Sequence, residues 1–318
     1  SNDGTVHLIR NDKMIEKNAP MASLTKRYTD EAIGFIERNK AKPFFVYLPH
    51  SMVHVKLAAT KEFEGKSDSG LYGDCIEEID HNVGRILETL KTLDLDKNTY
   101  VIFTSDNGPW WLGGPRWKKK LSRGHSYGGV SGPLRGWKAS TWEGGLRVPC
   151  VMRAPGKIPA GKTCNEITTT MDMLPTLAKL AGAKTPDDRI IDGGDISGLM
   201  HATPGAKAPT EAFYYYAFTH LRAVRKGKYK LHIPAKPGDS MAKRWNRTSP
   251  KEDAVYSGKS PALYDLEADL GETTDIAAKH PAVVKELLAL IEAARADIGD
   301  HDRIGKGARF FDPQEKRP

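Results

Sequence analysis

Cysteine is scarce in this 318-residue chain, which contains only Cys75, Cys150 and Cys164. The three lie far apart without a CxxC spacing, and an odd number leaves at least one of them unpaired. A disulfide framework and a cysteine-rich zinc site are therefore both excluded. We interpret the three thiols as structural.

Long hydrophobic runs are also missing, since no stretch of 18 or more apolar residues occurs. The first residues, Ser1 to Lys13, lack the basic, apolar and small-residue regions of a signal peptide and are more typical of a cloning boundary. Hydrophobic residues still make up 39% of the chain, enough for a substantial core in one large domain or two smaller ones. We expect a soluble protein that does not span a membrane, while export is neither indicated nor excluded.

Acidic residues are outnumbered, with 40 Asp and Glu against 48 Lys and Arg, which gives a net charge of +8. This balance favours an anionic partner. The densest basic tract runs from Arg116 to Arg123, although a solvated basic loop explains the tract equally well. Because no helix-turn-helix, RNP or zinc-finger pattern surrounds it, we expect no binding to nucleic acid.

Two segments repeat the order of helix, short loop and apolar strand. Apolar residues at helical spacing predict a helix over Leu24–Asn39, followed by a strand over Phe44–Leu48. A second helix over Asp74–Leu93 precedes a strand over Thr99–Thr104. This alternation predicts an α/β domain with a largely parallel sheet flanked by helices, in which sites lie at the carboxyl ends of the strands.

The chain changes character after the second strand. Residues 109–145 are rich in Gly, Trp, Lys and Arg without periodicity, which predicts a long functional surface loop. A strand over Val148–Arg153 and a helix over Thr170–Gly182 are expected next. Beyond Pro204 the patterns predict a smaller antiparallel sheet and a terminal helix, with strands over 213–218, 221–224 and 229–233 and the helix over 281–298. We therefore expect a domain over residues 1–202, a C-terminal subdomain over 203–300 and an extended tail over 301–318.

A carboxylate and an amide, Asp106 and Asn107, follow the second predicted strand, and Gly108-Pro109 supplies a sharp turn behind them. Their hard oxygen atoms would suit calcium or magnesium better than zinc. The tripeptide Asp-Asn-Gly is also a common turn, and on its own the turn is the better explanation.

Two further side chains could act on an anion. His54 follows the first predicted strand, with His50 before it, and an imidazole there can bind an anionic ligand or transfer protons near neutral pH. Lys138 lies in a glycine-punctuated loop, where an ammonium group could neutralise a sulfate or phosphate oxygen. Taken alone, such a histidine is more often structural and such a lysine more often solvated.

Four blocks of sequence together resemble the type I sulfatases, the arylsulfatase-like branch of the alkaline phosphatase superfamily. The resemblance spans roughly residues 22 to 295, and the blocks occur in the family's order, at 43–57, 72–109, 134–161 and 262–277. It implies an alkaline phosphatase-like α/β fold, hydrolysis of a sulfate ester such as a sulfated carbohydrate or an aryl sulfate, and a periplasmic or secreted location.

The resemblance also implies roles for single residues. Asp106 and Asn107 match the family's calcium-binding pair, while Lys138 and His54, rather than His50, match its sulfate-contacting lysine and histidine. The nucleophile in this family is a formylglycine, which is made from the cysteine or serine of a Cys/Ser-x-Pro-x-Arg motif.

That motif does not occur around any of the three cysteines. Ser131-Gly-Pro-Leu-Arg135 matches the bare pattern, but it follows the Asp-Asn pair and overlaps the lysine block, so we interpret it as coincidence. The family's paired aspartates, which supply other metal ligands, are also missing. We therefore expect the C-terminal portion of a larger sulfatase that is inactive in isolation, although a short reading frame that no longer encodes an enzyme, or a second chain carrying the nucleophile, would also explain the pattern.

Two other functions stay open. The chain could be a non-catalytic binding protein for sulfated polysaccharide that uses the basic tract and the tryptophans Trp110, Trp111, Trp117, Trp137 and Trp142. It could also be a phosphoryl-transfer relative, for which additional His or Asp ligands would be expected near Asp106, and "DNGPWW" offers none. The oligomeric state is not predicted.

Overall fold

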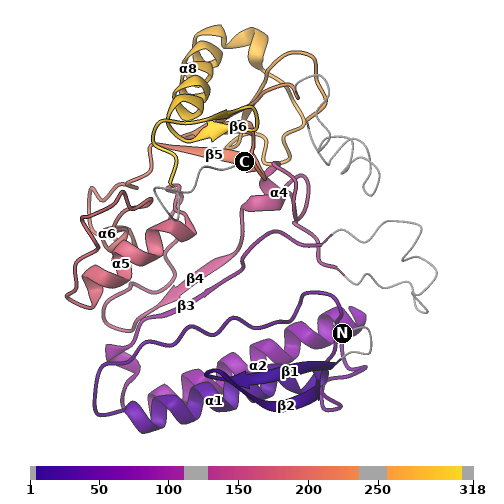
Figure 1. Cartoon of the computed structure of the whole chain (residues 1–318), viewed down its shortest axis with the longest axis vertical. Helices are drawn as coiled ribbons and strands as arrows, with labels where there is room; N and C mark the ends of the chain where they lie inside the picture. The colour runs from indigo at the N-terminus through magenta and orange to yellow at the C-terminus, as the bar shows by residue number, and fades with distance from the viewer. Residues whose placement is uncertain (1–4, 111–127, 236–255, 310–318) are drawn as a thin grey trace. The chain divides into compact units, whose positions relative to one another are not determined.

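The computed structural model describes residues 5–110, 128–235 and 256–309. The chain forms two compact units (Figure 1). Of the described residues, the first unit comprises 5–101, 110, 128–130 and 154–156, and the second comprises 102–109, 131–153, 157–235 and 256–309. The predicted boundary between residues 202 and 203 falls inside the second unit and stays a prediction.

A β-hairpin that the sequence analysis did not predict opens the first unit. Strands β1 (Thr5–Arg10) and β2 (Lys13–Pro20) pair antiparallel around a two-residue turn, in which Asn11 adopts a φ of 52°. Asparagine tolerates this left-handed conformation, which two-residue hairpin turns require. The buried side chains of Leu8 and Ala19 pack on Leu24, at the point where the hairpin leads through the 3₁₀ helix η1 (Met21–Ser23) into the next helix.

Two long helices lie side by side in the first unit (Figure 1). Helix α1 (Leu24–Asn39) confirms the predicted bounds, and α2 (Gly70–Thr92) begins four residues before the predicted start. An ion pair between Arg85 and Asp30, with 2.6 Å between nitrogen and oxygen, joins them. The 3₁₀ helix η2 (Asp96–Asn98) follows α2.

The predicted strand over Phe44–Leu48 is wrong. This segment is extended, and its side chains alternate between half-buried and exposed, with Phe45 69% and Tyr47 79% exposed. It pairs with no strand among the described residues, and without a neighbouring backbone its donors and acceptors form no ladder. Of the predicted central sheet, the described residues form only a two-stranded piece, β3 (Val101–Thr104) with β4 (Cys150–Arg153).

Short helices follow in the second unit. Helix α4 (Glu143–Leu146) lies in the region predicted as a long loop. The helix predicted over 170–182 begins as the 3₁₀ helix η3 (Thr170–Asp172), which Thr169 and Asp172 stabilise in a capping box, and continues as α5 (Met173–Leu180). Helix α6 (Ser197–Met200) completes this region.

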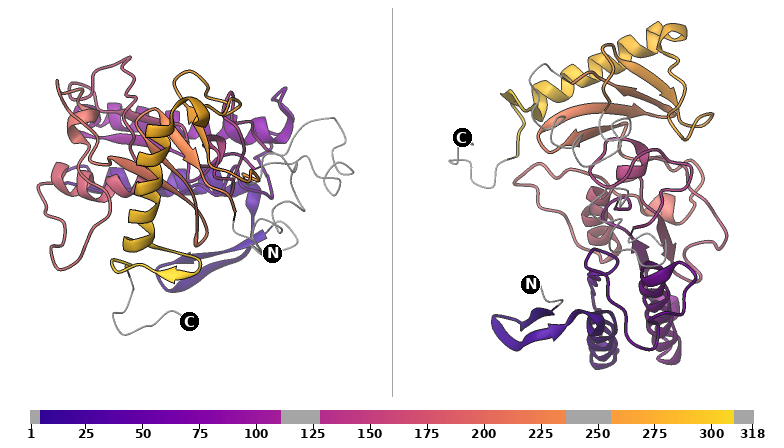
Figure 2. Two further views of the ribbon diagram at one scale, coloured as in Figure 1. Left: turned by 90° about the horizontal axis from the view of Figure 1, so that it is seen from above. Right: turned by 90° about the vertical axis from the view of Figure 1, so that its right-hand side faces the viewer.

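The predicted antiparallel sheet with its helix is confirmed. Four strands pair in the order β5 (Ala212–Ala217), β6 (His220–Lys226), β7 (Tyr229–His232) and β8 (Ala262–Asp265), of which β8 was not predicted. The 3₁₀ helix η4 (Ala277–Lys279) precedes helix α8 (Pro281–Asp297), which lies along the sheet (Figure 2). Burial of apolar side chains on both elements forms the core of this region, including Leu221, Val224, Leu231, Leu263, Leu287 and Ile291.

The expected extended tail is wrong in its first part. Residues Arg303–Ile304 form β10, which pairs antiparallel with β9 (Gly299–Asp300). The buried carboxylate of Asp300 holds this small hairpin, because it accepts hydrogen bonds from the backbone of Leu221 and the side chain of Arg295. Residues 310–318 lie outside the described part. No helix within the described ranges is long and apolar enough to cross a membrane.

Candidate functional site

The Asp106-Asn107 pair lies where β3 ends, as predicted. Asp106 is exposed and Asn107 is half-buried. The Asn107 side-chain nitrogen donates to the carbonyl oxygen of Gly108 at 2.9 Å, which leaves its side-chain oxygen as an acceptor. Ser105 donates to the carbonyl oxygen of Asn107 at 3.0 Å and fixes the turn. A carboxylate and an amide oxygen are the donor types that calcium takes, so this pair fits the metal that the sequence analysis expected.

Gly108 holds this turn against the loop that carries Lys138. Its amide donates to the carbonyl oxygen of Gly145 at 3.0 Å. A Cβ atom at position 108 would meet the carbonyl oxygen of Gly144 at 1.8 Å. Only glycine therefore permits this approach of the two backbones.

Lys138 is half-buried, and its amide donates to the carbonyl oxygen of Pro109 at 2.8 Å. The loop bends sharply around it, because Gly136 has a φ of 83° and Ala139 a φ of 73°. An alanine in this left-handed region is uncommon and needs support from its surroundings. The structure thus brings the backbone of Lys138 together with the turn that carries Asp106 and Asn107.

Ser131, which matches the bare nucleophile pattern, is engaged in its own turn. Its hydroxyl lies 2.7 Å from the carbonyl oxygen of Leu134 and 3.0 Å from that of Gly136. Both neighbours are acceptors, so the serine stabilises the backbone that precedes Lys138.

His54 belongs to the first unit. Its side chain is exposed, and Nδ1 donates to the carbonyl oxygen of Val55 at 2.6 Å, so Nε2 is the ring nitrogen that takes no part in this contact. His50 is half-buried, and burial lowers its pKa. Neither ring nitrogen of His50 has a hydrogen-bond partner among the described residues.

Two buried carboxylates of α2 hold the loop that follows His54, and the sequence analysis missed both. Asp74 accepts hydrogen bonds from the backbone amides of Gly65, Lys66 and Ser67 at 2.8 to 3.1 Å. One turn along the helix, Glu78 accepts from the amide of Thr60 at 2.9 Å. The sequence could have indicated them, because both acidic residues fall on the helix face that also carries the apolar residues Cys75 and Ile79.

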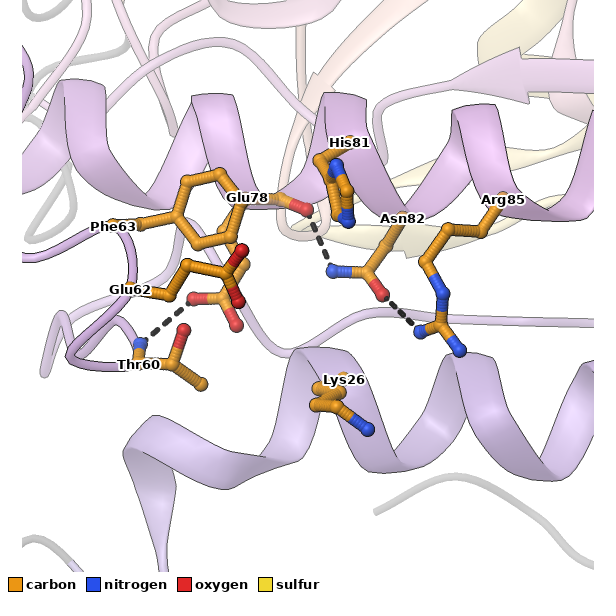
Figure 3. Close-up of a pocket in the computed structure, with 8 residues that line it drawn as sticks. All are labelled: Lys26, Thr60, Glu62, Phe63, Glu78, His81, Asn82 and Arg85. Atoms are coloured by element: carbon orange, nitrogen blue, oxygen red, sulfur yellow. Dashed lines mark hydrogen bonds between the residues drawn. The ribbon is translucent and has the colours of Figure 1, made fainter.

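A small pocket of about 170 Å³ lies beside this loop (Figure 3). Glu78 and Asn82 of α2 line it together with Phe63 of the loop and Lys26 of α1. Asn82 is fixed in the wall, since it donates to the carbonyl oxygen of Glu78 at 2.8 Å and accepts from Arg85 at 2.9 Å.

A buried group of charges, which we call the Lys230 cluster, joins the lysine loop to the C-terminal sheet and was also missed. Its members are Glu143, Lys230 and Glu272, all 0% or 1% exposed. The Lys230 ammonium lies 3.0 Å from a Glu143 oxygen and 2.8 Å from a Glu272 oxygen. The side chains are separated by up to 129 residues in sequence, so no local pattern could have indicated their contact.

Electrostatics keep both carboxylates of the Lys230 cluster ionised. Burial by itself raises the pKa of Glu143, but Lys230, Tyr215 and Arg225 outweigh it and lower that pKa to about 2. Burial also raises the pKa of Glu272, but the groups around it, Lys230 above all, outweigh burial and lower that pKa. His232 donates to Glu272 at 3.0 Å as a neutral ring, because burial lowers its pKa to about 4.

The proposed aromatic platform is wrong for Trp142, which is 1% exposed. Arg135 covers one side of its ring at 3.8 Å, and the ring of His232 lies 4.2 Å away. Trp111, Trp117 and the basic tract Arg116–Arg123 lie outside the described residues.

Comparison with known proteins supplies the family. The family model described as "Sulfatase" matches residues 3–183, and that described as "C-terminal region of aryl-sulfatase" matches residues 208–315. Human steryl-sulfatase is 42% identical over 69% of this chain and 36% of its own length. The arylsulfatase of Hemicentrotus pulcherrimus is 32% identical over 92% of this chain and 53% of its own.

Solved structures agree with the sequence matches. A structure described under the metabolism of multiple glycosaminoglycans by Bacteroides thetaiotaomicron superposes with a TM-score of 0.73 at 30% identity, covering 89% of this chain and 56% of the other. A Pseudoalteromonas sulfatase shares the fold, with a TM-score of 0.72 at 24% identity over 87% of this chain and 53% of the other. The chain spans between about a third and a half of the length of the curated relatives it matches. Together, the matches over both units show that this α/β chain belongs to the sulfatase family.

Proposed function

We propose that this chain contributes part of a calcium-assisted sulfatase site, with the formylglycine nucleophile supplied by residues outside the chain. One observation carries the proposal. The Asp106-Asn107 turn is hydrogen-bonded to the loop of Lys138 through Gly108 and Pro109, so metal donors and an ammonium group share one local framework.

The oxygen atoms of Asp106 and Asn107 would hold the calcium ion. When bound, calcium stabilises negative charge on the sulfuryl oxygens. Two protein donors are far fewer than the roughly 6 to 8 oxygens that calcium takes. We therefore expect the isolated chain to bind calcium weakly.

Lys138 and His54 would act on the sulfate ester itself. The ammonium group of Lys138 supplies positive charge and hydrogen bonds to an oxygen on which negative charge develops. Nε2 of His54 is the nitrogen that can receive or deliver the proton of the alcohol, because Nδ1 is engaged with Val55.

A sulfated carbohydrate is the substrate class we propose. Family membership supports hydrolysis of a sulfate ester, and relatives named N-acetylgalactosamine-6-sulfatase, 39% identical over 67% of this chain, support a sugar as the sulfated alcohol. A secreted or periplasmic location would suit such a substrate and is part of the proposal.

Hydrolysis of an aryl sulfate tests the proposal. We expect no turnover by the pure 318-residue chain and calcium-dependent turnover by the parent protein that includes the nucleophile. Turnover by the pure chain would overturn the assignment of the nucleophile to another segment. Salt-sensitive retention on a sulfated resin, with no hydrolysis by the parent protein, would instead support a binding protein for sulfated polysaccharide.

A further inference from the structure

We propose that the Lys230 cluster is a positioning device, which holds the Asp106-Asn107 turn and the Lys138 loop in place from the C-terminal sheet. This proposal deepens the proposed function. It rests on that function only for the roles of the turn in metal binding and of the loop in contacting sulfate. The positioning itself follows from contacts within the second unit.

The ionic contacts of the Lys230 cluster are all buried. Lys230 has no exposed surface and lies between the carboxylates of Glu143 and Glu272. Glu143 accepts further hydrogen bonds from Tyr215 at 2.6 Å and from Arg225 at 2.9 Å. A buried charge that loses its partner is strongly unfavourable, so these side chains stay in contact.

The backbone of Glu143 is held as well as its side chain. Its amide donates to the second carboxylate oxygen of Glu272 at 2.7 Å. Glu272 also fixes the start of the loop, because its carbonyl oxygen accepts from Arg135 at 2.9 Å. Both ends of the segment 135–143, which carries Lys138, are therefore attached to the same glutamate.

The path from Glu143 to the Asp106-Asn107 turn is short. The next residue, Gly144, donates to the carbonyl oxygen of Arg135 at 2.7 Å and so closes the loop. The residue after that, Gly145, accepts the hydrogen bond from Gly108, which directly follows Asn107. A displacement of Glu143 would be transmitted to Gly108 without a flexible side chain between them.

The Lys230 cluster and the apolar core that packs α8 lie on opposite faces of the sheet, so positioning of the lysine loop can be distinguished from stability of the sheet itself. Successive side chains of a strand point to opposite faces. On β7, Leu231 belongs to the apolar core shared with α8, whereas Lys230 and His232 contact Glu143 and Glu272. The sheet therefore packs α8 against an apolar core on one face. On the other face, buried charges meet the lysine loop beside the apolar contacts of Trp142 with Ala262 and Tyr264.

Amide hydrogen exchange of the 318-residue chain tests the proposal. In Lys230→Met we expect the amides of Gly108 and Lys138 to exchange at least about tenfold faster, because the local opening free energy falls, while the β5–β8 amides change much less. Lys230→Arg keeps the charge at similar volume and should restore protection at both amides. Lys228→Met is the matched control, since it removes a partly exposed pair with Asp265 next to the same strand.

A second variant keeps the test decisive if Lys230→Met does not fold. Glu143→Gln keeps the side-chain shape and an oxygen acceptor but removes the charge, and should also speed exchange at Gly108 and Lys138. Unchanged exchange at these two amides, or acceleration in step with the sheet amides, would overturn the proposal. Because exchange requires no turnover, its outcome is independent of the aryl sulfate assay.

Discussion

The amide of Gly108 donates to the carbonyl oxygen of Gly145, and this one bond links the turn after β3 to the lysine loop. The two residues are neighbours only in the folded chain. Their backbones approach so closely that neither Gly108 nor the adjacent Gly144 has space for a side chain.

Gly108→Ala should destabilise the second unit by about 2–4 kcal/mol, because its Cβ would overlap a backbone oxygen that cannot move aside. Thermal or denaturant unfolding measures the effect. Gly84→Ala is the control, since an added Cβ meets nothing within 4 Å in helix α2 and should be neutral or stabilising by up to about 1 kcal/mol. Equal stability of the two variants would show that the contact relaxes without cost.

Lowering the pH should destabilise the chain through His232. Its folded pKa of about 4 lies below the ordinary 6.5, so the unfolded state binds the proton more readily between these values. The stabilisation is complete above pH 6.5 and is lost as the pH falls toward 4, with about 2 kcal/mol lost by pH 5. Glu143, whose folded pKa is about 2 against 4.5, adds a further loss below pH 4.5.

Denaturant midpoints at pH 7.5 and pH 5 measure this loss. His232→Gln keeps an N–H group for Glu272 but does not titrate, so its midpoint should fall less between the two pH values. His7→Gln changes an exposed histidine and should behave as the wild type does. If His232→Gln showed the same pH dependence as the wild type, His232 would be excluded as the cause.

Asp74→Asn should release the loop that follows His54. The amide group replaces one carboxylate oxygen and cannot accept all three backbone hydrogen bonds, which we expect to cost about 1–3 kcal/mol. Trypsin cleavage after Lys66 should become faster. Asp80→Asn, an exposed change on the same helix, should leave the cleavage rate as it is. Identical digestion of both variants would argue against the role of Asp74.

Lys138→Ala should lower turnover of an aryl sulfate by the parent protein about 10²–10³-fold, as for the loss of one donor to a developing charge. The melting temperature should change little, since the substitution keeps the Lys138 amide that donates to the carbonyl oxygen of Pro109. Lys228→Ala provides the control for loss of one positive charge. Full activity of the Lys138 variant would exclude its contact with the sulfate group.

Local patterns predicted the elements that their own side chains specify. Apolar spacing located α1, α8 and the antiparallel strands β5 to β7, because each needs one face buried. The strand over Phe44–Leu48 was predicted on the same grounds and failed, since pairing depends on a neighbour that the segment does not contain. The hairpin β1–β2 and strand β8 were missed, although the turn Asn11-Asp12 offered a usable signal.

The sequence by itself determined the family, the main helices and most strands of the C-terminal sheet, and the identity of Asp106, Asn107, Lys138 and His54 as candidate residues, because short motifs in a fixed order carry that information. Only the tertiary structure decided that Glu143, Lys230 and Glu272 meet, and that the Asp-Asn turn is attached to the lysine loop. The physical reason is that a buried charge and a backbone hydrogen bond both depend on partners distant in sequence, which only folding brings within reach.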